Sequence, residues 1–162
     1  MVSNLNMTAV SQFSSRGSSM MEARRGASYL YSKVLSRARR RNLLHKLTHR
    51  ENQLQDLSAI SSDAKRQPPE SVGIVSVPLS KIIGSEGRVQ DFDNAFNPLK
   101  AHNRDRWIGI AAARQKGTSL PPVDLIQAGH QYYVRDGHHR ISVAKAFGQA
   151  EIEAQIVYVL AN

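Results

Sequence analysis

The stretch over residues 132–146, YYVRDGHHRISVAKA, constrains the fold of this chain more than any other segment. It begins as an apolar, β-prone run that stops at Asp136 and Gly137, and an alanine-rich helical pattern starts immediately afterwards. A strand that turns through glycine into a helix points free backbone N–H groups and the positive end of the helix dipole at one place. His138, His139 and Arg140 follow there, so the segment predicts a phosphate or nucleotide site.

The segments around this stretch predict alternating strands and helices, as in a small domain. Strands are expected at 73–79, 123–126, 131–134 and 152–160, and helices at 102–116 and 138–147. Residues 80–83 are interpreted as a short turn and 84–99 as a polar loop. The order β-α-β-β-α-β predicts an α+β domain over residues 72–160, with a small mixed β-sheet and packed helices.

The first part of the chain has a different composition. Residues 1–27 are rich in Ser, Asn, Met and Gly without periodicity, which predicts disorder. The range 28–61 contains no Gly or Pro and is expected to be one helix, and a linker with two prolines follows over 61–70. Four leucines are expected to lie on one face of this helix. These are Leu43, Leu47, Leu54 and Leu57. Residues 28–67 are thus predicted to be a basic helical arm with its linker.

The positive charge of the chain is concentrated in this first part. Residues 1–67 hold 12 Lys+Arg against 4 Asp+Glu, a net charge of +8, whereas residues 68–162 hold 10 against 9, a net charge of +1. A basic arm suits a polyanionic partner such as nucleic acid, through phosphate neutralisation and counterion release. The leucine pattern also fits docking on the chain's own domain, or pairing with a second copy in a homodimer. All three interpretations remain open from the sequence.

Size and composition exclude several classes of protein. The chain has 162 residues and no cysteine, which rules out disulfides, thiolate metal ligands and cysteine nucleophiles. No run approaches the roughly 20 apolar residues that cross a bilayer, and no apolar signal segment of about 7–15 residues begins the chain. A cytoplasmic protein without membrane contact is therefore expected.

Each residue of the Asp-Gly-His-His-Arg turn has a physical reason to bind an anion. Arg140 offers a planar fork of donors suited to phosphate, and Gly137 lets the backbone approach a ligand closely. His138 and His139 point about 100° apart on a helix, which disfavours a shared metal ion, and no metal site is predicted. Asp136 is a candidate catalytic residue or, equally, a cap of the following helix.

The polar loop and the start of the next helix supply further candidates. Glu86, with Asp91 and Asp93, could hold Mg²⁺ beside substrate phosphates, although a solvated loop explains each carboxylate alone. Arg88 in the loop is a candidate phosphate ligand, because the loop would have to fold over a ligand at the turn. Arg104 or Arg106 at the start of the helix could reach the same phosphate.

These motifs resemble one known superfamily. The runs VPLSKI, LPPVDLI and YYVRDGHHRISVAKAFG, over about residues 72–160, are similar to the ParB/sulfiredoxin-like domain. That superfamily includes CTP-dependent DNA-partitioning clamps, sulfinic-acid reductases and a free-serine kinase. The resemblance implies that Gly137, His138, His139 and Arg140 form a turn that grips the phosphates of CTP, ATP or ADP, with Mg²⁺ as a candidate companion. The kinase-type members use acidic residues, for which Glu86 and Asp136 are the candidates.

The sequence also departs from the superfamily pattern. His138 stands where the reductases have their nucleophilic cysteine, so sulfiredoxin activity is not expected. The partitioning clamps carry a Gly-Glu-Arg-Arg turn and a helix-turn-helix module after the domain, whereas this chain ends at Asn162. The notion of a full partitioning protein is therefore set aside.

Two functions remain in competition. The first is a nucleotide-binding module whose basic arm over 28–61 contacts DNA or a protein partner. The second is a small Mg²⁺-dependent nucleotide-using enzyme, either a phosphotransferase or a nucleotide hydrolase, with Glu86 or Asp136 as base. A nuclease is disfavoured because no dense carboxylate and histidine cluster is expected. The first is preferred, because the strongest signal concerns binding and acid–base groups cannot be placed from spacing.

Overall fold

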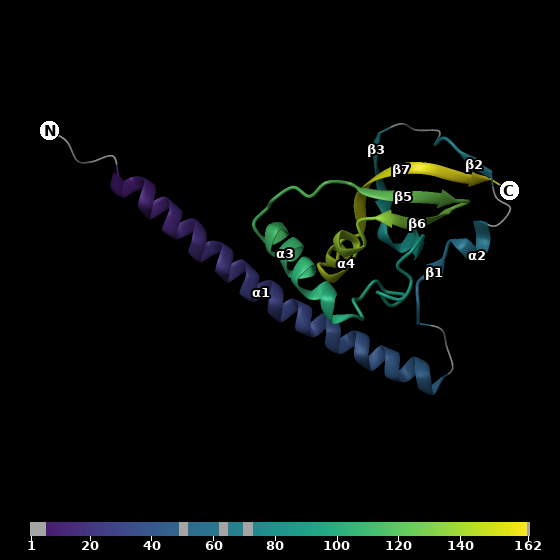
Figure 1. Cartoon of the computed structure of the whole chain (residues 1–162), viewed down its shortest axis with the longest axis horizontal. Helices are drawn as coiled ribbons and strands as arrows, with labels where there is room; N and C mark the ends of the chain where they lie inside the picture. Colours follow the sequence, from purple (N-terminus) through teal and green to yellow (C-terminus); the bar gives the residue numbers. More distant parts are fainter. Residues whose placement is uncertain (1–5, 49–51, 62–64, 70–72, 162) are drawn as a thin grey trace.

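A computed structural model describes residues 6–48, 52–61, 65–69 and 73–161. The chain has an α+β fold in which helices cover one mixed sheet, and this confirms the predicted class (Figure 1). The strands lie in the order β1 (Gln55–Asp56), β4 (Ile82–Ser85), β6 (Gln131–Asp136), β5 (Val123–Ala128), β7 (Glu151–Ala161) and β2 (Lys65–Gln67), and β3 (Ile74–Pro78) also pairs with β7. The β1–β4, β4–β6 and β5–β7 pairs are parallel, and the others are antiparallel.

The predicted order of elements is present, with additions that the sequence did not reveal. The helices of the domain are α2 (Ser58–Ser61), α3 (Arg104–Gln115) and α4 (His138–Ala146), with short 3₁₀ turns at Leu79–Lys81 and Ala101–Asn103. The segment 80–83 was expected to be a turn, but its second half belongs to β4. That strand is short and pairs on both sides, with β1 and β6, so its pairing rather than its composition defines it.

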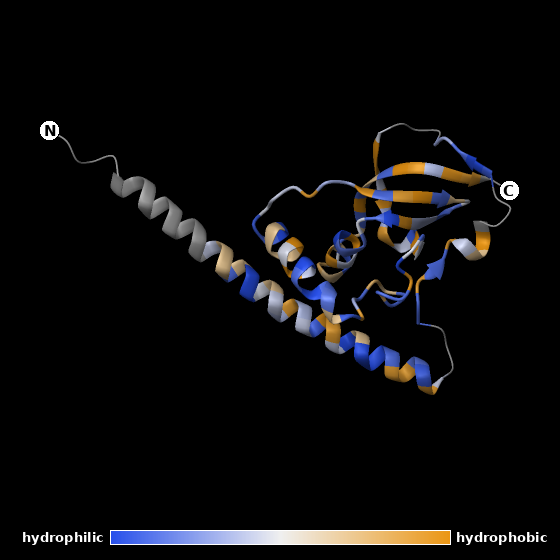
Figure 2. Cartoon of the chain, viewed as in Figure 1, coloured by the Kyte–Doolittle hydropathy of each residue, from blue (hydrophilic) through white to orange (hydrophobic). Residues whose placement is uncertain are grey.

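Helix α4 lies at the centre of the packing. Ile141 and Ala144 face the sheet, where they join a buried cluster with Val123, Leu125 and residues of the polar loop. Val143, on another side of α4, belongs to a second cluster formed with α1 and α3. The hydropathy colouring of Figure 2 shows the same arrangement, with hydrophobic residues gathered on the strands and on the inner faces of α3 and α4. The turn before α4 is therefore held from both sides.

The long helix α1 (Asn6–Leu47) docks on the domain. Ala27, Tyr31 and Val34 are buried against α3, and the ring of Tyr31 meets that of Trp107 edge-on at 5.4 Å between centroids. The spacing of these small and aromatic residues places them on one helix face. Of the three fates open to the basic arm, docking on its own domain is the one present in this structure. No helix of the described residues has both the length and the apolar character to cross a membrane.

The predicted boundaries of the first part of the chain were wrong. The structure continues α1 back to Asn6, where disorder was expected over 1–27, since the segment has no proline and its Ser and Gly residues cost only fractions of a kcal/mol to about 1 kcal/mol each in a helix. The helix also ends at Leu47 rather than continuing to 61. Residues 1–5 lie outside the described residues.

The predicted leucine face does not exist as a helical face. Leu43 and Leu47 are 61% and 71% exposed near the end of α1, whereas Leu54 and Leu57 lie beyond the helix and are buried in two different clusters beside the sheet. The chain after α1 runs along β4 as β1, and part of the expected linker forms β2 against β7. The residues after α1 therefore pair with the sheet, and do not continue the helix that the leucine spacing predicted.

Loss of the Tyr31 ring should loosen α1 and expose the single tryptophan. We expect Tyr31→Ala to lower the free energy of unfolding by about 2 kcal/mol, less than a fully packed aromatic residue, because the buried Tyr31 hydroxyl has no hydrogen-bond partner among the described residues. Fluorescence emission of Trp107, now fully buried, should shift to longer wavelength. Tyr29→Ala is the matched control, because Tyr29 is 66% exposed on the same helix. Equal spectra for the two variants would contradict the docking.

Candidate functional site

The candidate site is the junction of β6 and α4. Gly137 is the N-cap of α4, with φ 101° and ψ 16°, and no side chain caps the helix. The first α-helical bond, from the Ile141 N–H to the Gly137 carbonyl, is 3.0 Å long. The uncapped N–H groups of the first turn remain available, and they carry the positive end of the helix dipole. The turn therefore has the backbone geometry that binds anions.

Glycine is required at position 137 for two reasons. A φ of 101° lies in the left-handed region, which side chains disfavour. A Cβ there would also lie 2.5 Å from Cγ1 of Val123 in β5. The close approach of the turn to β5 thus fixes where α4 begins.

Arg140 ties the turn to the segment that leads into β5. Its Nη1 donates to the carbonyl oxygens of Pro121 and Pro122, at 2.8 and 2.6 Å, and its Nη2 donates to the carboxylate of Asp136. A guanidinium has five N–H donors, so these three bonds leave about two for a ligand. Asp136 was predicted as a helix cap or a base. Gly137 holds the N-cap position, and Asp136 is the ion-pair partner of Arg140. Arg140 therefore positions the turn and has N–H donors beyond those that these three bonds use.

His138 is held by a serine that the sequence did not single out. The Ser85 hydroxyl accepts the backbone N–H groups of Gly87 and Arg88, at 3.2 and 3.0 Å, and lies 2.7 Å from Nε2 of His138. The hydroxyl also lies 3.5 Å from the Val134 carbonyl oxygen, and which partner donates in the Ser85–His138 bond depends on the tautomer of the imidazole. The bond fixes the imidazole and the start of the polar loop together.

Both histidines are buried and neutral. Burial is the main cause that lowers the pKa of His138 to about 4, and the charge of Arg88 adds to it. Burial likewise lowers the pKa of His139 to about 4, followed by the charges of Arg106 and Arg88. The ring of Phe92 stacks on His138 and meets His139 edge-on. At neutral pH the positive charge of the site therefore comes from arginines and not from the histidines.

Three arginines converge on a small cleft at this turn. The cleft has a volume of about 30 Å³ and is lined by Arg88 from the polar loop, Arg106 from α3, Arg140, and the residues of the turn. Among the described residues, Asp136 is the only carboxylate in the lining, so three arginines face one negative charge. The three arginines come from three separate segments, the polar loop, α3 and α4, which the fold brings to one cleft. The positive charge and the small volume of the cleft suit the oxygen atoms of a phosphate group.

The structure brings together most of the predicted ligand residues but not Arg104. Gly137, His138, His139, Arg140 and Arg88 all line the cleft. In contrast, the Arg104 guanidinium donates to the Ser28 hydroxyl of α1, at 3.0 Å, and pairs with Asp105. Arg106, two positions later, supplies the charge from α3 instead.

Glu86 lies outside this cleft. Its carboxylate accepts the Tyr158 hydroxyl at 2.9 Å and lies 3.8 Å from Nε of Arg135. Glu86 does not line the cleft, and so the two predicted catalytic carboxylates, Glu86 and Asp136, do not share one site.

The carboxylates expected to hold Mg²⁺ have other partners. Asp93 is buried and accepts backbone and side-chain N–H groups of Ala95 and Asn97. Asp91 pairs with Lys100 at 2.9 Å. Within the part of the chain that the structure describes, no group of three His, Asp or Glu side chains is placed to bind a metal ion. Asp91 and Asp93 therefore order the loop through these contacts.

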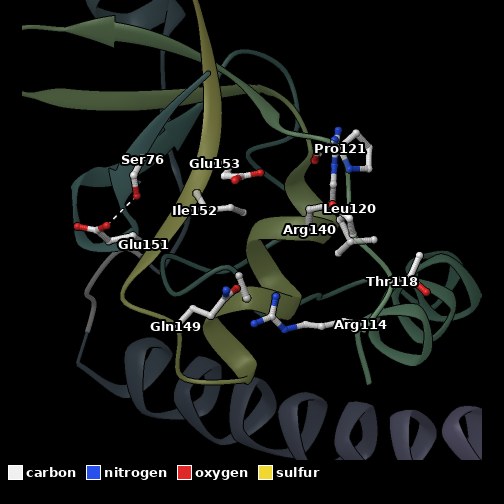
Figure 3. A pocket seen from close by; sticks show the side chains of 12 residues that line it. Ser76, Arg114, Thr118, Leu120, Pro121, Arg140, Gln149, Glu151, Ile152 and Glu153 are labelled. Atoms are coloured by element: carbon white, nitrogen blue, oxygen red, sulfur yellow. Dashed lines mark hydrogen bonds between the residues drawn. The ribbon is translucent and has the colours of Figure 1, made fainter. Parts of the chain in front are cut away.

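A larger pocket adjoins the turn. It has a volume of about 330 Å³, and Arg140 lines both this pocket and the small cleft. Figure 3 shows the guanidinium of Arg114 extending from α3 across the pocket toward Gln149, with Glu151 bound to Ser76 at the far side. Glu153 adds a second carboxylate to that wall. The pocket therefore has charges of both signs and room for a small polar molecule.

Comparison with known proteins gives limited information. No protein-family model and no curated protein matches the sequence. Among solved structures, the crystal structure of sulfiredoxin from Arabidopsis thaliana is similar over 52% of this chain and 83% of that chain, with 27% sequence identity and a TM-score of 0.36. At this TM-score the likeness carries no weight for function, which therefore rests on the residues of this chain.

Proposed function

We propose that this protein is a nucleotide-binding module that holds phosphate at the N-terminus of α4. The observation that carries the proposal is the convergence of Arg88, Arg106 and Arg140 on an uncapped helix N-terminus. Arginines combined with free backbone N–H groups are a recurring way to bind phosphate. The adjoining pocket, which Arg140 also lines, has the volume of a nucleoside-sized site. The candidate ligands are CTP, ATP and ADP.

Binding without turnover is the form of this proposal that the side chains support. Asp136 is the single carboxylate lining the cleft and is already bound to Arg140. General base catalysis needs an acceptor within hydrogen-bond reach of the attacking group. Mg²⁺, where it accompanies a nucleotide, would be held by the phosphates, because the loop carboxylates of this chain have other partners.

Calorimetric titration with CTP, ATP and ADP, with and without Mg²⁺, tests the proposal. We expect one of these nucleotides to bind, and Arg106→Gln to weaken that binding about 10-fold, the scale of one charge-assisted hydrogen bond lost. Arg104→Gln is the matched control, because it removes the same charge from the same helix outside the cleft. The proposal fails if no nucleotide binds or if the two variants weaken binding equally.

A measurement of phosphate release distinguishes the module from the enzyme. We expect no nucleotide turnover with or without Mg²⁺. Turnover that depends on Mg²⁺ and disappears in Glu86→Gln would contradict the binding module and support a nucleotide-using enzyme.

A further inference from the structure

A second cationic site lies at the opposite end of α4 from the turn. A groove of about 480 Å³ runs between the C-terminal half of α1, the end of the polar loop and the last turn of α4. Four cations line it, with small or uncharged residues between them and no carboxylate. They are Arg37, Arg40, Arg41 and Lys145.

The groove is built by the docking of α1. Arg37 and Arg41 are one helical turn apart and follow the buried Val34, so they share the side of α1 that faces the domain. The Arg41 Nη2 donates to Oδ1 of Asn94 in the polar loop, at 2.8 Å. This bond fixes the guanidinium at the groove edge.

Lys145 completes the groove from α4. Its Nζ lies over the ring of Phe96, 4.6 Å from the ring centroid, and burial lowers the pKa of the ammonium. Within the described part of the chain, none of the four groove cations forms an ion pair with a carboxylate. Lys145 is partly desolvated, with the carboxylate of Asp93 as a charge beyond ion-pair distance, whereas Arg37 and Arg40 are exposed. An incoming polyanion would supply close counter-charges to these cations.

The size of the charged surface indicates a polymeric ligand. From Lys33 to Lys46, α1 carries four Arg and two Lys and no acidic residue. This part of the helix is roughly 20 Å long at 1.5 Å per residue, long enough to run beside several phosphates of a nucleic-acid strand. Arginine is the residue that pairs best with phosphate, and a row of arginines on a rigid helix matches a repeated phosphate better than a single one.

We propose that this groove binds the sugar–phosphate backbone of nucleic acid independently of base sequence, through Arg37, Arg40 and Lys145. The groove and the phosphate-binding turn share no lining residue. The backbone-binding proposal can therefore stand or fall without the nucleotide proposal.

Fluorescence anisotropy with labelled single-stranded and duplex DNA of about 20 nucleotides tests this proposal over a salt series. We expect the wild-type protein to bind at least one of the two forms. The variant Arg37→Gln/Arg40→Gln should weaken binding at least 10-fold and reduce the slope of log K against log salt by about 1.4–1.8, which corresponds to two phosphate contacts. The control Arg24→Gln/Arg25→Gln removes the same charge from exposed positions of α1 outside the groove and should change binding less than about 3-fold.

Three results would overturn the backbone-binding proposal. They are no binding of either DNA at low salt, equal weakening by the groove and control variants, and equally tight binding of polyglutamate or inorganic tripolyphosphate. Thermal melting checks that each variant is folded. If Arg37→Gln/Arg40→Gln unfolds, Lys145→Met tests the same groove from α4, and unchanged DNA binding by this variant would count against the proposal.

Discussion

Replacement of Gly137 by alanine is expected to destabilise the domain strongly. The left-handed φ of 101° costs a side chain roughly 1–2 kcal/mol. The Cβ would also meet Cγ1 of Val123 at 2.5 Å, and overpacking of this kind costs about 1–3 kcal/mol more. We therefore expect Gly137→Ala to lower the free energy of unfolding by about 2–5 kcal/mol and the Tm by roughly 10 °C, measured by thermal denaturation.

Two further variants separate the cost of the left-handed backbone from the cost of the clash between the new Cβ and Val123. Gly129 also has a positive φ, of 59°, but a Cβ there has no atom within 4 Å, so Gly129→Ala should cost only about 1 kcal/mol. Adding Val123→Ala to Gly137→Ala should restore part of the loss, because it removes the methyl group that the new Cβ meets. If Gly137→Ala and Gly129→Ala melt at the same temperature, the turn is not held against β5 as described.

The second large effect is a loss of stability in mild acid. Folding lowers the pKa of His138 and of His139 from 6.5 to about 4, mainly by burial. Between these values the unfolded chain binds more protons than the folded chain, so stability falls as the pH falls. Each histidine contributes about 3 kcal/mol that is present above pH 6.5 and lost toward pH 4.

Urea denaturation at several pH values between 7 and about 4.5 measures this dependence. The variant His138→Gln should flatten the pH profile by roughly half, because one of the two buried imidazoles is gone. His130→Gln is the control, since His130 is exposed in the β5–β6 turn and its removal should leave the profile unchanged. A wild-type profile that is flat over this range would show that the histidines are not buried in the neutral form.

The elements that the sequence predicted well are those with local causes. An apolar run, an Asp-Gly pair and an alanine-rich helix are neighbours in sequence, so β6, the turn and α4 follow directly from residues 132–146. The hairpin of β5 and β6 has the same local origin. These segments also carry Gly137 and Arg140, and the turn was for this reason the strongest prediction.

The first part of the chain depended on contacts that no local pattern shows. Leucine spacing suggested one helical face over 28–61, but Leu54 and Leu57 pack beside the sheet after the chain leaves α1. The face that docks is made of small and aromatic residues around Tyr31, which meet Trp107 from a distant part of the sequence. Leucine alone was a poor guide, because the partner surface decides which residues are buried.

The remaining site residues were partly accessible from the sequence. Arg104 and Arg106 were equal candidates by composition, and only the rotation of α3 decides that Arg106 lines the cleft while Arg104 contacts α1. Ser85 could not be recognised, since its contact with His138 requires β4, which was divided between a predicted turn over 80–83 and a polar loop over 84–99. The separation of Glu86 from Asp136 likewise follows from sheet pairing and not from spacing.

The most direct test of the account is to map nucleotide binding on the protein by ¹⁵N–¹H NMR. Titration with the nucleotide that binds in calorimetry should perturb the backbone amides of the α4 first turn, from His138 to Ile141, and those around Arg88 and Arg106. The amides near Lys145 at the other end of α4 should change little. Perturbations absent from the first turn of α4, or no perturbation by CTP, ATP or ADP at all, would contradict the claim that this turn holds nucleotide phosphate.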